Sequence, residues 1–257
     1  MEYCSLMSGS WGNCHFISAG ETSILIDAGQ SGKRILANMK IAGCGDRPSP
    51  SAILVTHAHR DHITGVGVLA RRMGVPVYAT EGAWLEMGDI AGEIPDELKR
   101  TIGSAERWTI GSLDLEAFPT SHDALESVGY VIRNENNAIG IATDIGVFTS
   151  RMEQVLRDMQ ILIIEANHDL DMLRTGKYPG YLKKRIAGVD GHLSNDDAGK
   201  ALTKIFGPKT EKVVLAHLSQ ENNTREKALD TVVRALPDIS RFLSVAPRCT
   251  PGEWIRI

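Results

Sequence analysis

Short apolar runs separated by turn residues dominate the first 55 positions of the chain. They predict strands at residues 3–7, 15–18, 22–27 and 52–55, with a helix at 31–42 between the third strand and the fourth. The helix is expected to end at Gly43, because glycine readily adopts the left-handed conformation that terminates helices. The N-terminal region is therefore predicted to be mainly β-sheet.

Helical and strand patterns alternate along the rest of the chain. Apolar spacing predicts helices at 66–72, 83–98, 150–157, 195–205 and 224–236, the second of them broken near Gly92 and Pro95. It predicts strands at 75–78, 113–117, 128–133, 138–142, 161–165 and 212–216. Both halves thus carry sheet and helix, an α/β order that two stacked sheets flanked by helices would accommodate. No linker, repeat or low-complexity tract interrupts the pattern, so residues 1–257 are predicted to form one domain.

Composition and charge narrow the classes of protein that need be considered. With 257 residues, 42% hydrophobic and 23% charged, the chain resembles ordinary globular proteins. It shows no secretory signal or membrane span, and its four cysteines lack CxxC spacing, so a cytoplasmic protein without membrane contact is expected. The net charge of −4 gives no general attraction to nucleic acid, and a polyanion would have to be held by metals and a local basic patch.

Three histidines and an aspartate crowd into one stretch directly after the strand predicted at 52–55. The stretch is Thr56-His57-Ala58-His59-Arg60-Asp61-His62. Imidazole and carboxylate groups are preferred ligands of zinc and similar divalent cations, and a tight turn at a strand end can direct neighbouring side chains at one point. A polar loop with chance histidines would rarely hold so many ligand groups, so the stretch predicts a metal site.

Three more ligand-type side chains follow later strands, namely His122, Asp144 and His217. A single histidine after a strand is more often a packed or surface residue, and an aspartate in such a place can simply form a turn. Asp144 is flanked by apolar residues, however, where an unpaired carboxylate would be costly. The number and order of these residues favour a role in the same metal site.

The HxHxDH pattern after a buried strand, followed by these three residues in this order, resembles the metallo-β-lactamase superfamily. The resemblance implies a four-layer αββα sandwich of two mixed β-sheets flanked by helices. It also implies a pair of metal ions: one held by His57, His59 and His122, the second by Asp61, His62 and His217, with Asp144 bridging both.

The resemblance extends to the YycJ/WalJ-type exonuclease branch of that superfamily. The matching segments are 8–14, 25–29, 56–65, 165–169, 178–182 and 191–195, of which the NHD of 167–169 and the GHLSN of 191–195 are the most specific to the branch. Trp11 departs from the family pattern, because the pattern predicts a small residue at this position. The resemblance implies a 5′ to 3′ DNA exonuclease that uses two divalent metal ions, zinc or manganese, with iron as a further option.

His168 and His192 lie outside the expected ligand set. Comparable histidines face the scissile phosphate in nuclease branches of the superfamily, so the resemblance implies catalytic and substrate-binding roles for both, one as proton donor to the leaving 3′ oxygen. Asp61 is expected to orient or deprotonate the attacking water besides binding metal. The alternative that His168 caps a helix and His192 orients a turn stays open.

A basic segment runs between these two histidines. It contains Arg174, Lys177, Lys183, Lys184 and Arg185, interleaved with Tyr178 and Tyr181. Basic side chains can neutralise phosphates and tyrosine rings can stack on unpaired bases, so Lys183, Lys184 and Arg185 are candidate contacts to nucleic acid. A solvated helix face explains such a charge run equally well.

Two residues nearer the N-terminus complete the candidate site. Asn13 lies in a small-residue turn from which its amide can support a metal ligand or reach a phosphate, although an ordinary hairpin turn is equally compatible. Asp27 resembles a residue that lies close to the metals in the superfamily, as a partner of a histidine ligand. Taken alone, it would be interpreted as a turn residue.

The same set of ligands serves several activities. A small-molecule phosphodiesterase, or an ester, thioester or lactam hydrolase, is the main alternative to a nuclease, but a thioesterase would leave His168 and His192 without a clear use. A non-catalytic metal-binding regulatory protein is the second alternative, against which the complete ligand set argues. Nucleic acid, and DNA in particular, is the predicted partner.

Overall fold

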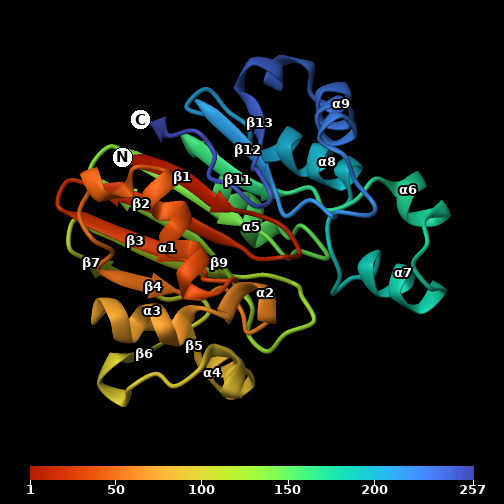
Figure 1. Ribbon diagram of the computed structural model, residues 1–257. Coiled ribbons are helices and arrows are strands. Elements are labelled where there is room, and N and C mark those ends of the chain that lie inside the picture. The colour runs from red at the N-terminus through yellow and green to blue at the C-terminus, as the bar shows by residue number, and fades with distance from the viewer.

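Two seven-stranded β-sheets stack face to face in the computed structural model, which describes residues 1–257 (Figure 1). The first sheet contains, in spatial order, β14 (Ile255–Arg256), β1 (Glu2–Met7), β2 (Cys14–Ala19), β3 (Thr22–Ile26), β4 (Ala52–Leu54), β5 (Val77–Thr80) and β6 (Lys99–Ile102). The second contains β13 (Leu243–Val245), β12 (Lys212–Ala216), β11 (Ile161–Glu165), β10 (Asn137–Ala142), β9 (Val128–Asn134), β8 (Leu113–Pro119) and β7 (Arg107–Ile110).

Both sheets are mixed. In the first, the strands from β14 to β3 pair antiparallel and those from β3 to β6 pair parallel. In the second, the strands from β13 to β10 pair parallel and those from β10 to β7 pair antiparallel. Parallel strands end at one edge of a sheet, so the residues that follow β3 and β4, and those that follow β10, β11 and β12, meet at shared edges.

Helices accompany each sheet. Those of the N-terminal half are α1 (Gly32–Ile41), α2 (Arg60–Ile63), α3 (Val66–Met73) and α4 (Glu81–Met87). Those of the C-terminal half are α5 (Ser150–Leu156), α6 (Leu170–Thr175), α7 (Gly180–Ile186), α8 (Asn195–Ile205) and α9 (Arg225–Ala235). No helix is both long enough and apolar enough to cross a bilayer.

Three apolar clusters hold the layers together, and alternation along the strands explains them. Ile24 of β3 belongs to the cluster between the sheets, together with Tyr130 and Ile141 of the second sheet. Leu25, the next residue, belongs instead to the cluster that packs under α1 and α3. A third cluster joins the outer face of the second sheet to α5, α8 and α9. Because successive side chains point to opposite faces of a strand, this pattern produces the four-layer sandwich and confirms the predicted fold class.

The helix predicted over residues 83–98, with a break near Gly92 and Pro95, is shorter than predicted. Helix α4 ends at Met87, and only 3₁₀ turns follow, at Gly88–Ala91 and Asp96–Leu98. Gly88 and Gly92 have φ values of +43° and +73°, which an α-helix cannot include. The short strands β6, β7, β13 and β14 and the helices α6 and α7 were not predicted individually, because their few residues show no clear apolar period.

Candidate metal centre

Seven ligand-type side chains from separate parts of the chain converge at the edge where the parallel strands end. Their ligand atoms form overlapping groups, each within 4.8 Å: His57 with His59 and His122, His57 with His62 and Asp144, and Asp61 with His62 and His217. These are the residues that the sequence singled out as metal ligands. We call this cluster the metal centre.

Strand ends and an unusual backbone conformation aim three side chains at this point. Asp27 follows β3, Asp144 follows β10, and His217 follows β12, with φ values of +59°, +57° and +56°. A left-handed conformation costs roughly 1–2 kcal/mol for a residue other than glycine, although Asp, Asn and His tolerate it best. Three such residues at one edge indicate that the direction of their side chains is under constraint.

A close backbone approach holds the loop that carries Asp61 and His62. A Cβ atom on Gly29 would lie 1.6 Å from the carbonyl oxygen of Asp61, so only glycine fits there. The backbone nitrogen of Asn13 donates to that same oxygen at 2.8 Å, and the backbone nitrogen of Ala28 donates to the carbonyl of His62 at 2.8 Å. The loop is thus tied to the turns that follow β1 and β3.

Three of the histidines have their Nδ1 atoms engaged by oxygen acceptors, so that Nε2 is the ring nitrogen directed into the cluster. His62 Nδ1 lies 2.7 Å from Asp27, His122 Nδ1 lies 3.0 Å from the Gly191 carbonyl, and His217 Nδ1 lies 2.8 Å from Glu165. Partners of this kind set the tautomer and orientation of metal-binding imidazoles. Asp27 also accepts from the nitrogen and hydroxyl of Thr56, at 2.8 Å each, so its role as a histidine partner has direct geometric support.

The chemistry of the donor set fits a bound divalent cation. His57 Nε2 and Asp144 Oδ2 are buried and have no hydrogen-bond partner, although such groups are rarely left unpaired. Burial disfavours the charged form of His62, but the carboxylates of Asp144, Asp27 and Asp61 outweigh burial and raise its pKa to about 9. The site therefore attracts positive charge, which a cation can supply in place of a proton.

Glu165, the last residue of β11, is a site residue that the sequence reasoning quoted only as part of a motif. Its side chain is fully buried, and Oε1 lies 2.8 Å from the Nδ1 atoms of both His192 and His217. Oε2 accepts from the backbone nitrogens of Ile145 and Leu193, at 2.9 and 3.1 Å. Glu165 thus links a predicted metal ligand to a predicted catalytic residue. A buried glutamate at the end of an otherwise apolar strand was the available signal.

The two histidines predicted to act on substrate have different positions. The ring of His192 lies 4.9 Å from that of His122 and 5.2 Å from that of His217, beside the metal centre. His168 is outside the clustered groups, 1% exposed, and its Nδ1 has no partner. Burial lowers the pKa of His168, while Glu165 has the opposite effect on it. The structure thus brings His192, rather than His168, into the cluster.

The basic segment, Arg174 to Arg185, spans α6 and α7, which stand away from the two-sheet body (Figure 1). Arg185 pairs with Asp123, whose other oxygen lies 3.4 Å from His122 Nε2 and 3.6 Å from His59 Nε2. Asp123 was not predicted as a site residue, although it directly follows His122. Lys184 is exposed, and Lys183 Nζ donates to the Arg174 carbonyl at 2.9 Å. The C-terminal end of α7 therefore reaches the rim of the metal centre.

Asn13 lies directly against the cluster. Its Nδ2 is 3.0 Å from His62 Nε2 and 3.5 Å from Asp61 Oδ2, and its Oδ1 accepts from the Gly9 nitrogen at 2.9 Å. The side chain thus joins the turn between β1 and β2 to two of the ligand-type residues.

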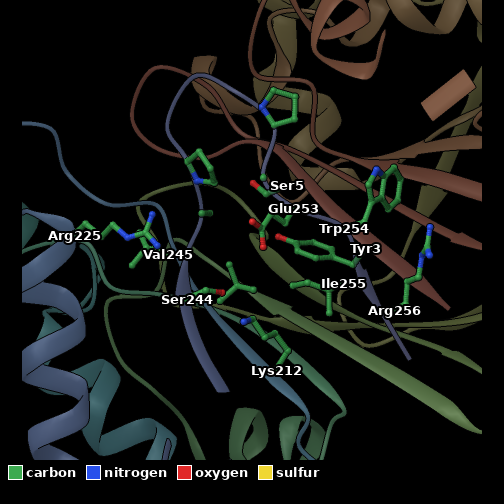
Figure 2. Close-up of a pocket in the computed structure, with 15 residues that line it drawn as sticks. Tyr3, Ser5, Lys212, Arg225, Ser244, Val245, Glu253, Trp254, Ile255 and Arg256 are labelled. Atoms are coloured by element: carbon green, nitrogen blue, oxygen red, sulfur yellow. The ribbon is translucent and has the colours of Figure 1, made fainter. Parts of the chain in front are cut away.

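A cavity of about 530 Å³ lies away from the metal centre, between β1, β12, β13 and the C-terminal segment. Figure 2 shows Tyr3 and Glu253 in the middle of the view, Trp254 at the right, Arg225 at the left and Lys212 below. It is lined by none of the residues that the sequence predicted for the site.

Comparison with protein families and solved structures agrees with this geometry. The family model of the beta-lactamase superfamily domain matches residues 22–218. The structure superposes on the metallo-beta-lactamase fold protein YhfI from Bacillus subtilis with a TM-score of 0.73, at 15% identity and 98% coverage of both chains. The chain belongs to the metallo-β-lactamase superfamily, whose fold and histidine-rich site it carries.

Two curated relatives define its place within that superfamily. The exodeoxyribonuclease YycJ from Bacillus anthracis is 39% identical over 238 residues, which cover 93% of this chain and 90% of the relative. The exodeoxyribonuclease WalJ from Streptococcus pneumoniae is also 39% identical over 238 residues, covering 91% and 88%. The chain therefore belongs to the YycJ/WalJ family, which confirms the resemblance inferred from its motifs, and it is a metal-dependent hydrolase.

Proposed function

We propose that this chain is a DNA exonuclease that hydrolyses phosphodiester bonds from the 5′ end with two divalent metal ions. The observation that carries the proposal is the metal centre, in which seven ligand-type side chains converge and two buried ligand atoms lack a hydrogen-bond partner. It lies in a chain that is 39% identical to proteins named exodeoxyribonucleases. Small-molecule hydrolases share such ligands, but the basic segment at the rim favours a polyanionic substrate.

The ligand geometry supports two metal positions. His57, His59 and His122 form one group, and Asp61, His62 and His217 form another. Asp144 lies between them, with carboxylate oxygens 3.4 Å from His62 Nε2 and 3.6 Å from His122 Nε2. Zinc or manganese, with iron as a further option, suits imidazole and carboxylate ligands. Two such ions, when bound, lower the pKa of water and stabilise negative charge on phosphoryl oxygens.

The chain's own groups orient the reacting atoms. The side chain of Asp61 is 26% exposed and thus within reach of solvent, so we assign it the role of orienting the attacking water and accepting its proton. Glu165 holds His192 through Nδ1, which leaves Nε2 to contact a nonbridging oxygen or to protonate the leaving 3′ oxygen. Asn13, Lys183, Lys184 and Arg185 are proposed to contact the substrate, and His168 retains its predicted role there.

We further propose that residues 1–257 act as one hydrolase domain located in the cytoplasm. The pairing of β14 with β1, and the hydrogen bond of 2.6 Å from the Met1 amino group to the Ile257 carbonyl, support one unit that includes both ends of the described chain. Four unpaired thiols support a reducing compartment.

The test is an assay of the metal-loaded protein on end-labelled single strands, on blunt duplex and on bis(p-nitrophenyl) phosphate. The expected result is stepwise shortening of DNA, with a 5′ label released at once in short products and a 3′ label retained in a ladder of shortened strands. The label thus reports the direction of hydrolysis.

Two other results would replace the proposal. Hydrolysis of the small diester without any shortening of DNA or RNA would indicate a small-molecule phosphodiesterase. Stoichiometric binding of zinc or manganese without hydrolysis of any substrate would indicate a metal-binding regulatory protein.

A further inference from the structure

A hollow of about 370 Å³ opens between the turn joining β1 to β2, the start of α1, and the segment around Arg248. Its lining includes Trp11, Gln30, Arg34, Gln220 and Arg248, and no carboxylate. This hollow, which we call the Trp11 pocket, is separate from the basic segment on α6 and α7. It shares no residue with any function assigned above.

Two short stretches of chain link the Trp11 pocket to the metal centre. Trp11 is two residues from Asn13, whose side chain contacts His62 at 3.0 Å, and Gln220 is three residues from His217. An extended chain spans about 3.3–3.6 Å per residue, so at most about 10 Å of backbone separates each of these two pocket residues from the residue of the site that it is linked to. Stacked nucleotides rise about 3.4 Å each. The pocket is therefore within reach of the first few nucleotides of a strand whose phosphate occupies the metal centre.

One hydrogen bond anchors the ring of Trp11 and another its backbone, although most of the side chain faces solvent. The side chain is 64% exposed, whereas Trp84, Trp108 and Trp254 are half-buried. Its Nε1 donates to Gln220 Oε1 at 2.6 Å, and the Gln30 amide donates to the Trp11 carbonyl. An indole that is both exposed and fixed loses little conformational entropy when a flat partner stacks on it.

The charges around the ring specify the kind of partner. Arg34 donates to the Cys249 carbonyl at 3.4 Å, and Arg248 donates to the Ser219 carbonyl at 2.7 Å and the Asn223 carbonyl at 3.3 Å. Neither guanidinium forms an ion pair with a carboxylate, so both keep their positive charge and free N–H donors. Guanidinium groups beside an aromatic face match the phosphates and base of an unpaired nucleotide.

We propose that the Trp11 pocket binds a nucleotide of the substrate strand next to the hydrolysed bond, with its base stacked on Trp11 and its phosphates held by Arg34 and Arg248. The proposal rests on the nuclease function proposed above and specifies an unpaired strand end as the substrate feature that is recognised. It also gives a role to Trp11, which departs from the small residue expected at this position. The basic segment would then bind the strand beside His59 and His122, and the Trp11 pocket would bind it beside Asp61 and His62.

The test measures both binding and turnover with single-stranded oligonucleotides. Tryptophan fluorescence of the metal-loaded protein is followed during titration with a phosphorothioate oligonucleotide, and KM and kcat are measured with the ordinary one. Trp11→Ala is expected to raise KM by about 5- to 150-fold, the range for loss of one base–aromatic stack, with a smaller effect on kcat. Trp11→Phe should raise KM less than Trp11→Ala. It should also remove most of the fluorescence quenching, because the other tryptophans belong neither to the Trp11 pocket nor to the metal centre.

Controls separate the pocket from the general fold and from the nuclease proposal. Leu85→Ala removes a side chain that is 74% exposed on α4, and it should leave KM and quenching unchanged. Arg34→Ala should also raise KM, which provides a second test if Trp11→Ala alters folding. An unchanged KM in both Trp11→Ala and Arg34→Ala would overturn the pocket assignment. Absence of DNA shortening by the unsubstituted protein would overturn the nuclease proposal, whereas quenching by the phosphorothioate oligonucleotide would still report on the pocket.

Discussion

The metal centre and the basic segment differ in how firmly the surrounding structure holds their side chains. In the metal centre, Asp144 and His217 are 2% exposed, and they follow central strands of the second sheet. In the basic segment, four of the five basic side chains lie on two helices of six and seven residues that stand away from the sheets, and Lys177 lies between these helices (Figure 1). Rigid strand ends suit chemistry that needs sub-ångström placement, whereas mobile basic side chains suffice to neutralise phosphates. The comparison therefore predicts that substitutions in the two regions affect different steps.

The largest effect is expected from removing a ligand-type side chain. His59→Ala or Asp144→Ala should abolish hydrolysis of both DNA and bis(p-nitrophenyl) phosphate, because each removes a group from the metal centre. The fold should be retained, since His59 is half-buried and Asp144 Oδ2 has no hydrogen-bond partner to lose. Activity assays with circular dichroism of the same samples check both statements.

Asp96→Ala is the matched control for Asp144→Ala. Asp96 carries an exposed carboxylate that pairs only with Lys99, so its removal should not change activity. Full activity in His59→Ala or Asp144→Ala would contradict the site assignment.

Removal of metal should have a comparable effect that can be reversed. Treatment with a chelator is expected to abolish hydrolysis, and addition of zinc or manganese should restore it. Because metal binds the folded state, a metal concentration of 100 times Kd should stabilise the protein by about 2.7 kcal/mol. The increase in Tm measures this effect in the unsubstituted chain, and the increase should be smaller in Asp144→Ala. An equal increase in both proteins would place the bound metal elsewhere.

A smaller effect is expected at Glu165, which positions ligands without being one of the seven. Glu165→Gln keeps the shape but removes the negative charge, and it replaces one of the two carboxylate oxygens by an NH2 group that cannot accept. The carboxylate now accepts at both oxygens, from His192 and His217 at Oε1 and from two backbone nitrogens at Oε2. Metal affinity or kcat/KM should fall by about 10- to 100-fold. Glu165→Asp should recover part of the loss, and metal titration together with a pH–rate profile distinguishes positioning from simple destabilisation. Unchanged metal affinity and an unchanged profile would show that Glu165 is only a core residue.

The smallest effect is expected in the basic segment. Combined replacement of Lys183, Lys184 and Arg185 by Ala should weaken binding of single-stranded DNA more than it slows hydrolysis of the small diester. The slope of log affinity against log salt should become shallower by up to about 2, since each phosphate contact contributes about 0.7 for single strands. Arg185 contributes less if its pair with Asp123 persists. Equal losses on both substrates would indicate that the segment is structural.

The sequence predicted more of the metal centre than of the residues that surround it. The HxHxDH stretch and the later His122, Asp144 and His217 were recognisable because ligand-type residues follow apolar runs in a fixed order. The partners of these ligands were less accessible. The contact between Glu165 and two histidines depends on the parallel pairing of β11 with β12, and the pair of Arg185 with Asp123 depends on where α7 lies.

The amino-acid sequence alone determined the two-sheet fold class, the family and the identity of the ligand-type side chains, because periodicity and motif spacing are local properties. Tertiary structure decided which atoms meet. Left-handed backbone conformations direct the side chains of Asp27, Asp144 and His217 toward the metal centre. The fold also places Trp11 beside Gln220, which lies 209 positions away in the chain. Such contacts depend on strand pairing and on packing between layers, and no local pattern of apolar and polar residues specifies them.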